Sequence, residues 1–226
     1  MTPAALESSL RDGAHALGLS LSDAQVAQLL AYLALLQKWG RVYNLTAVRE
    51  PAEMLTHHLL DSLAVIPPLR RHAEALGQPA LRVLDVGSGA GLPGVVIAVC
   101  CPDMAVTCVD TVAKKAAFVQ QVAVSLSLPR LRGLHARVET LTDPYDLVSA
   151  RAFASLGDFV RWSAGCLAPG GVWMAMKGKH PAQELAELPP QVQVFHVEPL
   201  QVPGLDAERC LVWMRQGPGG GADATQ

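Results

Sequence analysis

The apolar residues in the first third of the chain recur every three or four positions, which is the spacing of one helix face. The clearest series is Val26, Leu29, Leu30, Leu33 and Leu36. The stretch "SLSD" just before it offers serine and aspartate as N-caps. Paired prolines in "VIPPLRR" end the pattern, because proline interrupts a helix interior. Residues 1–67 are therefore predicted to form an N-terminal helical extension packed on the rest of the chain.

Beyond residue 67, short runs of β-forming residues alternate with amphipathic segments of helical spacing. The predicted strands are 81–86, 105–110, 131–139, 145–150 and 170–178, and the clearest helical segments between them are 111–126 and 154–167. Strands that alternate with helices predict a parallel sheet covered on both faces.

Two further apolar runs, 191–202 and 208–215, have no helical pattern between them, so we expect them to pair antiparallel at one edge of the sheet. The prediction is an α/β domain over residues 68–216 with a mostly parallel, seven-stranded, doubly wound sheet. Residues 217–226 are rich in glycine and have nothing to bury, so we expect a disordered tail there.

Composition narrows the class of protein only a little. A chain of 226 residues with 50% apolar content buries one substantial core, and a net charge of -2 excludes a globally basic nucleic-acid binder. The five cysteines form no C-x-x-C pair, so we expect reduced core thiols and no metal site. The sequence shows neither a signal-peptide pattern nor an apolar run of the roughly 20 residues that span a bilayer. We therefore expect a cytoplasmic protein without a membrane partner and, since no heptad seam is evident, a monomer.

Four glycines lie close together in "VLDVGSGAGLPG", directly after the first predicted strand. They are Gly87, Gly89, Gly91 and Gly94. In a doubly wound sheet this loop lies at the ligand-binding edge, where glycines permit positive φ and let backbone N–H groups approach a ligand closely. The helix expected to start near Leu92 points its positive end at any anionic group. The loop is therefore predicted to hold a ligand.

Two acids decide which ligand this glycine loop fits. Asp110 ends the second predicted strand, where a carboxylate can accept hydrogen bonds from both ribose hydroxyls of an adenosine, in nicotinamide and S-adenosylmethionine enzymes alike. Asp85, on the first strand itself, completes a D-x-G-x-G pattern that resembles motif I of the Rossmann-like methyltransferases, where the acid helps to hold the amino end of the methionine part. A carboxylate there would not favour a pyrophosphate at the helix N-terminus. S-adenosylmethionine is therefore the expected cofactor.

The acceptor of such an enzyme is expected at the end of the fourth predicted strand, which reads "SAR" over 149–151. The slot has neither the Asn/Asp-Pro-Pro-aromatic sequence of many amine acceptors nor a cysteine nucleophile for C5-pyrimidines. It also has no obvious general base, which suits an acceptor with a free lone pair, such as guanine N7. Arg151 and Lys177 end neighbouring strands and are candidates for contact with substrate phosphate or base edges. An ion pair of Arg151 with Asp146 or Asp158 is the structural alternative.

Polar residues of the helical extension supply further candidates. His57 and His58 lie on a predicted helix over 51–63, and Asp61 shares the face of His58. Metal binding is not expected, because a third ligand is missing nearby. His58 is either a structural, ion-paired histidine or a contact for RNA or cofactor, and Asn44 has no obvious use in a core.

Taken together, these motifs resemble one family, the bacterial 16S ribosomal RNA guanine-N7 methyltransferases, also called glucose-inhibited division protein B. The stretches that carry the resemblance are "YNLTAVREPAEMLTHHLLDSL", "LDVGSGAGLPG", "VDTVAKKAAFVQQV", "RVE", "SARAFASL", "MKG" and "LQVPGLDAERCLV". They follow one another over nearly the whole chain, which makes the set far more specific than a single glycine motif.

The resemblance implies a cytoplasmic enzyme that uses S-adenosylmethionine to methylate N7 of one guanine in 16S ribosomal RNA. The family's cofactor positions fall on Gly87, Leu92, Val138, Glu139 and Arg151. We expect Val138 and Glu139 to close the third strand beside the adenine, and the Arg151 cation to meet the methionine carboxylate rather than the sulfonium. Asp85, Gly89, Gly91 and Asp110 complete the expected cofactor site.

The acceptor side is expected to face 16S ribosomal RNA, either free or in an assembling small subunit. Arg151 and Lys177 are the predicted catalytic residues. The predicted RNA contacts are Asn44, His58, Lys177 and Arg209, of which Asn44 and Arg209 match family positions.

The sequence leaves three other functional hypotheses open. One is a methyltransferase for another RNA or a small molecule. A second is a nicotinamide-dependent oxidoreductase, although the chain shows no His, Tyr-Lys or metal set for hydride transfer. The third is a non-catalytic module that binds S-adenosylmethionine or RNA, which the "SAR" slot without a proton-transfer residue would suit equally well.

Overall fold

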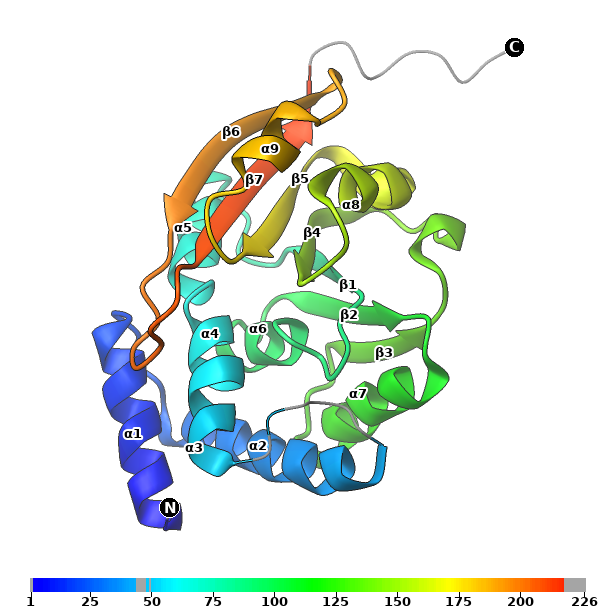
Figure 1. The fold of residues 1–226 in the computed structure, drawn as a ribbon. Coiled ribbons are helices and arrows are strands. Elements are labelled where there is room, and N and C mark those ends of the chain that lie inside the picture. Colours follow the sequence, from blue (N-terminus) through cyan, green and yellow to red (C-terminus); the bar gives the residue numbers. More distant parts are fainter. Residues whose placement is uncertain (1, 44–47, 49, 218–226) are drawn as a thin grey trace.

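A single seven-stranded sheet forms the centre of the structure, a computed structural model that describes residues 2–43, 48 and 50–217 (Figure 1). The strands are β1 (Arg82–Val86), β2 (Ala105–Asp110), β3 (Leu131–His135), β4 (Tyr145–Arg151), β5 (Leu167–Lys177), β6 (Val192–Pro199) and β7 (Cys210–Gln216), in the order β3-β2-β1-β4-β5-β7-β6. β1 to β5 pair in parallel, and β7 pairs antiparallel with both β5 and β6. The predicted mostly parallel sheet with an antiparallel edge is confirmed.

The order of the strands creates a switch point between β1 and β4. From β1 the chain proceeds to β2 and β3 on one side, and then returns to place β4 on the other side of β1. The register aligns Val86 with Ala150, and Arg151 with Met176. The carboxyl ends of the central strands therefore meet at one edge, where ligands bind in open α/β sheets.

The N-terminal helical extension is built from several helices along one face of the sheet (Figure 1). Its elements are α1 (Pro3–Ala16), α2 (Asp23–Tyr43), α3 (Pro51–Met54), the π-helical turn Leu55–Leu60, α4 (Asp61–Leu63) and α5 (Ile66–Ala75). The prolines of "VIPPLRR" do not end the helical region. They lie at the start of α5, because a proline in the first turn lacks only an N–H that would have no intrahelical partner.

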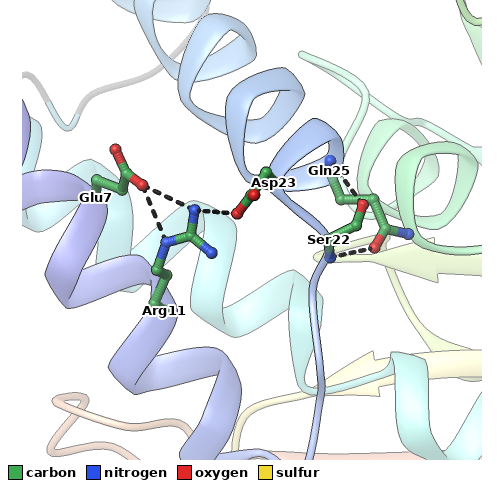
Figure 2. A network of polar contacts seen from close by, with 5 residues as sticks. All are labelled: Glu7, Arg11, Ser22, Asp23 and Gln25. Carbon is green, nitrogen blue, oxygen red and sulfur yellow. Dashed lines mark hydrogen bonds and ion pairs between the residues drawn. The ribbon is translucent and has the colours of Figure 1, made fainter.

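Two polar clusters fix the junction of α1 and α2 (Figure 2). Arg11 on α1 donates hydrogen bonds to Glu7 and, at 2.8 Å, to Asp23 at the start of α2. Ser22 and Gln25 cap α2 reciprocally, each backbone N–H donating to the other's side chain. The predicted serine cap in "SLSD" is thus confirmed at Ser22, whereas Asp23 forms an ion pair with Arg11.

Two cores cover the two faces of the sheet. Inward residues of one face, such as Val83 and Leu147, pack with the extension, α6 (Gly94–Cys100) and α7 (Ala113–Ser125). Their neighbours Leu84 and Val148 point to the other face and pack with α8 (Leu156–Ser163). A 3₁₀ turn (Ala164–Cys166) follows α8, and α9 (Ala182–Ala186) follows β5. The result is the expected three-layer α/β arrangement.

The third strand is shorter than predicted. β3 ends at His135, and Val138–Thr140 form a 3₁₀ turn in which the backbone and hydroxyl of Thr140 both donate to the carbonyl of Arg137. Val138 and Glu139 therefore do not close the strand as expected. The apolar and β-branched residues of "LRGLHARVE" fit a strand, but the hydroxyl contact of Thr140 lies beyond the run and favours the turn.

Candidate functional site

Two cavities open at the carboxyl edge of the sheet, one on each side of Gly87, which lines both. The first, of about 520 Å³, is called the acceptor cavity below, and the second, of about 320 Å³, the adenosine cavity. The acceptor cavity is lined by His57, His58, Asp61, Gly87, Ser88, Gly89, Ala90, Leu92, Arg151, Ala152, Met176, Lys177, Gly178 and Arg209. The adenosine cavity is lined by Val86, Gly87, Val109, Asp110, Thr111, Val112, Lys115, Ala136, Arg137, Val138, Glu139, Phe153 and Trp162. Together they offer room for one elongated ligand.

The glycine loop forms the wall between these cavities. Gly87, Gly89 and Gly91 all have positive φ, a region that side chains disfavour. Gly94 has an ordinary φ, but a Cβ there would overlap the Cys108 sulfur. The loop glycines thus serve backbone conformation, and Gly94 serves close packing of α6 on the sheet.

Asp85 lies beneath the glycine loop, fully buried, and lines neither cavity. One carboxylate oxygen accepts a hydrogen bond from the Gly94 N–H at 2.9 Å, and the other accepts from the Ser149 hydroxyl at 3.0 Å. Burial raises the pKa of Asp85 to about 6, against the opposing effect of these two hydrogen bonds. Asp85 therefore occupies the N-terminus of α6 itself, which leaves that helix end unsuited to a pyrophosphate.

Asp110 ends β2 and shapes the loop from the adenosine side. Its carboxylate accepts hydrogen bonds from the Gly89 N–H at 3.0 Å and the Val112 N–H at 2.9 Å, and Lys115 Nζ lies 3.7 Å away. Each carboxylate oxygen has a second lone pair, so ribose hydroxyls can still be accepted from the cavity.

The far wall of the adenosine cavity combines the 3₁₀ turn with aromatic rings. Val138 is buried there, and the Glu139 carboxylate accepts a 2.8 Å hydrogen bond from Arg137. Glu139's own backbone N–H, and then Arg137, lower the pKa of Glu139. Phe153 packs edge-to-face with Trp162, and its ring lies 3.0 Å from where a Cβ on Gly87 would be. A wall of apolar side chains and aromatic rings beside the Glu139 carboxylate can accommodate an adenine ring.

Arg151 lies at the end of β4 and pairs with neither of the two acids predicted from the sequence. Its Nη1 donates to Asp61 at 3.0 Å and to the His57 carbonyl at 3.1 Å. Asp146 and Asp158, the partners weighed from the sequence, instead pair with Arg82 and Arg161. The predicted ion pairs of Arg151 with Asp146 or Asp158 are therefore wrong. Both acids lie close to Arg151 in sequence, on β4 and α8, whereas the actual partner is 90 residues away.

Asp61 also binds the second arginine of the acceptor cavity. Its other carboxylate oxygen accepts a 2.8 Å hydrogen bond from Arg209 Nε, and the Asp61 side chain is only 4% exposed. Arg209 further donates to the Glu208 carbonyl. The structure thus brings two predicted site residues, Arg151 and Arg209, to one buried carboxylate.

Lys177 lies across the acceptor cavity at the end of β5. Its Nζ contacts both oxygens of Glu184 on α9, at 3.0 and 2.7 Å, and Glu184 also accepts from the Leu156 N–H at the start of α8. The Lys177 side chain is mostly buried and lines the cavity. Its cation is therefore held at the cavity wall by a carboxylate.

His58 lies in the π-helical turn that forms part of the cavity wall. Burial, and then the charge of Arg151, lower the pKa of His58 to about 4, so the imidazole is neutral at pH 7. The predicted helix over 51–63 exists but contains this turn, a feature often found at functional sites. Leu92, a predicted cofactor contact, is buried in the wall of the same cavity. Asn44, a predicted RNA contact, lies outside the described residues.

Sequence reasoning missed several residues that shape the cavities. Tyr32 on α2 donates a 2.8 Å hydrogen bond to the Ala90 carbonyl and so braces the glycine loop from the helical extension. Glu184 and Phe153 were also unassigned, and Asp61 was noted only beside His58. A tyrosine on an otherwise apolar helix face was the one available signal for Tyr32.

The described residues hold no group of three or more His, Cys, Asp or Glu side chains that could bind a metal ion. All five cysteines are buried and unpaired with one another, as expected of core thiols. In the same part of the chain, no helix has the length and apolar character needed to cross a bilayer.

The chain is similar to small-subunit ribosomal RNA methyltransferases along most of its length. The family profile "rRNA small subunit methyltransferase G" (GidB) matches residues 25–212. The protein named ribosomal RNA small subunit methyltransferase G of Polaromonas sp. (strain JS666 / ATCC BAA-500) is 69% identical over 210 residues, 92% of this chain and 93% of the relative. Its namesake in Acidovorax sp. (strain JS42) is 67% identical over 214 residues, 92% and 95% of the two chains.

A solved structure extends the likeness to the fold. The ribosomal protein L11 methylase from Lactobacillus delbrueckii subsp. bulgaricus superposes with a TM-score of 0.53 at 15% identity, over 70% of this chain and 78% of that one. The two proteins therefore share a fold. With the profile match and the two relatives, the chain belongs to the ribosomal RNA small subunit methyltransferase G (GidB) family.

Proposed function

We propose that this protein transfers a methyl group from S-adenosylmethionine to N7 of a specific guanine in the 16S ribosomal RNA of the small subunit. The observation that carries the proposal is the pair of cavities that adjoin at Gly87, in a chain of this family. One cavity contains Asp110, Val138 and Glu139, the expected partners of ribose and adenine. The other contains three cationic side chains, those of Arg151, Lys177 and Arg209. A cofactor across the glycine loop would present its reactive end to the cationic cavity.

The described residues fit the cofactor from end to end. Asp110 would accept the ribose hydroxyls, and Val138 and Glu139 would address the adenine. Gly87, Gly89 and Leu92 form the wall along which the cofactor would lie. Gly91 supports this wall through its positive φ, and Asp85 holds it in place from below. Arg151 would meet the methionine carboxylate. When bound, S-adenosylmethionine supplies an electrophilic methyl group on a sulfonium.

The acceptor cavity suits a nucleophile that needs no deprotonation. Asp61 is engaged by two guanidinium groups, and His58, with a pKa of about 4, is a poor proton acceptor at pH 7. Guanine N7 carries its own lone pair, so alignment of the acceptor with the methyl group supplies most of the catalysis. Arg209, Lys177 and His58 would hold the RNA around this base, with Lys177 and Arg151 nearest to the transfer.

The partner and location follow from the same proposal. The substrate is 16S ribosomal RNA, free or in an assembling small subunit in the cytoplasm, and the enzyme acts as a monomer. A stable dimer at micromolar concentration in sedimentation would contradict the monomer.

The direct test is to incubate the protein with methyl-labelled S-adenosylmethionine and small subunits from cells that lack this enzyme. Digestion of the RNA should yield label in 7-methylguanosine at one position. Small subunits from cells that contain the enzyme are the matched control and should accept little label, because their site is already methylated. Label in another nucleoside would contradict the guanine N7 proposal, and cofactor binding without any transfer would favour a different acceptor or a binding module.

A further inference from the structure

Asp61 joins three parts of the chain that are far apart in sequence. It starts α4 in the helical extension, while Arg151 ends β4 and Arg209 directly precedes β7. The two arginines donate to different carboxylate oxygens, at 3.0 and 2.8 Å. One buried acid therefore sets the positions of two cations at the acceptor cavity.

The geometry leaves both arginines able to bind something else. Arg151 uses Nη1 for Asp61 and the His57 carbonyl, and Arg209 uses Nε and Nη1 for Asp61 and the Glu208 carbonyl. Among the described residues, Nε and Nη2 of Arg151 and Nη2 of Arg209 have no hydrogen-bond partner. The two side chains are 23% and 24% exposed and line the cavity, so these donors are accessible to a ligand.

We propose that Asp61 is a positioning residue that holds Arg151 toward the cofactor and Arg209 toward the RNA. The identity of the two ligands rests on the proposed function, whereas the arrangement of the three side chains does not. Asp61 lines the acceptor cavity, but both of its carboxylate oxygens accept from the arginines, so its effect on the two ligands passes through them. It acts because an arginine side chain has several rotatable bonds, and a fixed carboxylate removes that freedom before a ligand binds.

The other end of β4 offers a matched control for the loss of an arginine–aspartate pair. Asp146 accepts hydrogen bonds from the Arg82 backbone and guanidinium, at 2.8 and 2.9 Å, and its side chain is 25% exposed. Neither residue lines the acceptor or adenosine cavity. Asp146→Asn therefore removes an arginine-bound carboxylate at the far end of β4 from Arg151, without reaching either cavity.

The first measurement compares Asp61→Asn with Asp146→Asn. Asp61→Asn keeps the shape of the side chain but removes its charge, so we expect about tenfold weaker binding of S-adenosylmethionine by calorimetry and about tenfold higher KM for small subunits. Asp146→Asn should leave both values within about twofold of the wild type. If Asp61→Asn does not fold, Asp61→Glu replaces it, because the longer side chain keeps the charge but displaces it. Unchanged affinity for both ligands in either variant would overturn the proposal.

A double-mutant cycle separates positioning from general loss of structure. Arg151→Gln should weaken cofactor binding and Arg209→Gln should raise the KM for RNA alone. If Asp61 acts through Arg151, adding Asp61→Asn to Arg151→Gln should change cofactor affinity by less than about twofold. Full additivity in this cycle would overturn the proposal. Cofactor affinity is measured without RNA, so the cycle remains decisive even if labelling finds a different acceptor.

Discussion

The glycine loop between the two cavities and the charged wall of the acceptor cavity are held in place in different ways. The glycine loop is held by bonds from its backbone to carboxylates on adjacent strands, from Gly94 to Asp85, nine residues apart, and from Gly89 to Asp110, 21 residues apart. The acceptor side uses long charged side chains whose partners are 90 residues away, for Arg151 and Asp61, and 148 residues away, for Arg209 and Asp61. The glycine loop is tied to the ends of neighbouring strands, whereas the acceptor side joins distant parts of the chain around one buried carboxylate.

Because of this difference, we expect the residues that hold the glycine loop to affect mainly stability, and those of the acceptor side to affect mainly ligand recognition. Asp85 is fully buried with neutral donors, so a change there disturbs the packing of β1, β4 and α6 together. Lys177 and Glu184 retain contact with solvent, which weakens their mutual attraction. We therefore expect changes around the glycine loop to alter the free energy of unfolding most, and changes on the acceptor side to alter catalysis most.

Asp85→Ala should have the largest effect on stability. It leaves the Gly94 N–H and the Ser149 hydroxyl buried without their acceptor, which should lower the free energy of unfolding by about 4 kcal/mol and weaken S-adenosylmethionine binding through the distorted loop. Urea denaturation and calorimetry measure the two effects. Asp85→Asn is the control, because its amide can accept from Gly94 and donate to Ser149, and it should stay within about 1 kcal/mol of the wild type. Equal stability of the alanine variant and the wild type would remove the contrast between the two sides.

The pH dependence of stability sharpens the comparison, because Asp85 and His58 act in opposite directions. Folded Asp85, with a pKa of about 6, keeps its proton where an unfolded aspartate with a pKa of 3.8 has lost it. Between these values the folded state binds more protons, so Asp85 lowers the free energy of unfolding as pH rises from about 4 to about 6. Folded His58, with a pKa of about 4 against an unfolded value of 6.5, binds fewer protons than it does in the unfolded state. His58 therefore raises the free energy of unfolding as pH rises over the same interval.

His58→Gln should therefore expose the contribution of Asp85. Without the opposing contribution of His58, the free energy of unfolding of this variant should itself fall by up to about 3 kcal/mol between pH 4 and pH 6, whereas in the wild type the two contributions largely cancel. Urea denaturation at pH 4, 5 and 6 measures the slope. Asp85→Asn should show the reverse slope relative to the wild type, and identical profiles for all three proteins would contradict the assignment of both groups.

The same contrast explains what the sequence could and could not predict. The sheet, its edge and the glycine loop follow from local patterns, and the loop's ligand-facing carboxylate at Asp110 was found because it ends a strand. The pairing of Asp61 with Arg151 and Arg209 could not be found, since no local pattern links the three positions. The end of β3 was misjudged for a related reason, because the turn at Val138 depends on a hydrogen bond from Thr140 that apolar periodicity does not register.

Lys177→Ala should have the smallest effect on stability and a clear effect on catalysis. The variant loses one partly exposed ion pair, so the free energy of unfolding should change by less than about 1 kcal/mol. Cofactor affinity should stay within about twofold, while kcat/KM for small subunits should fall about tenfold, because a cation that faces the RNA is gone.

Glu184→Gln tests whether the reaction needs the Lys177 charge or the Lys177–Glu184 ion pair. The amide releases Lys177 from its carboxylate but leaves the lysine charge in the cavity, and its carbonyl can still accept from Leu156 at the start of α8. If Lys177 contacts RNA, kcat/KM for Glu184→Gln should equal or exceed that of the wild type, opposite to Lys177→Ala. Equal losses in both variants would mean that the ion pair itself, and with it the packing of α9, is what the reaction needs. The acceptor side would then resemble the glycine-loop side in depending on structure rather than on free charge.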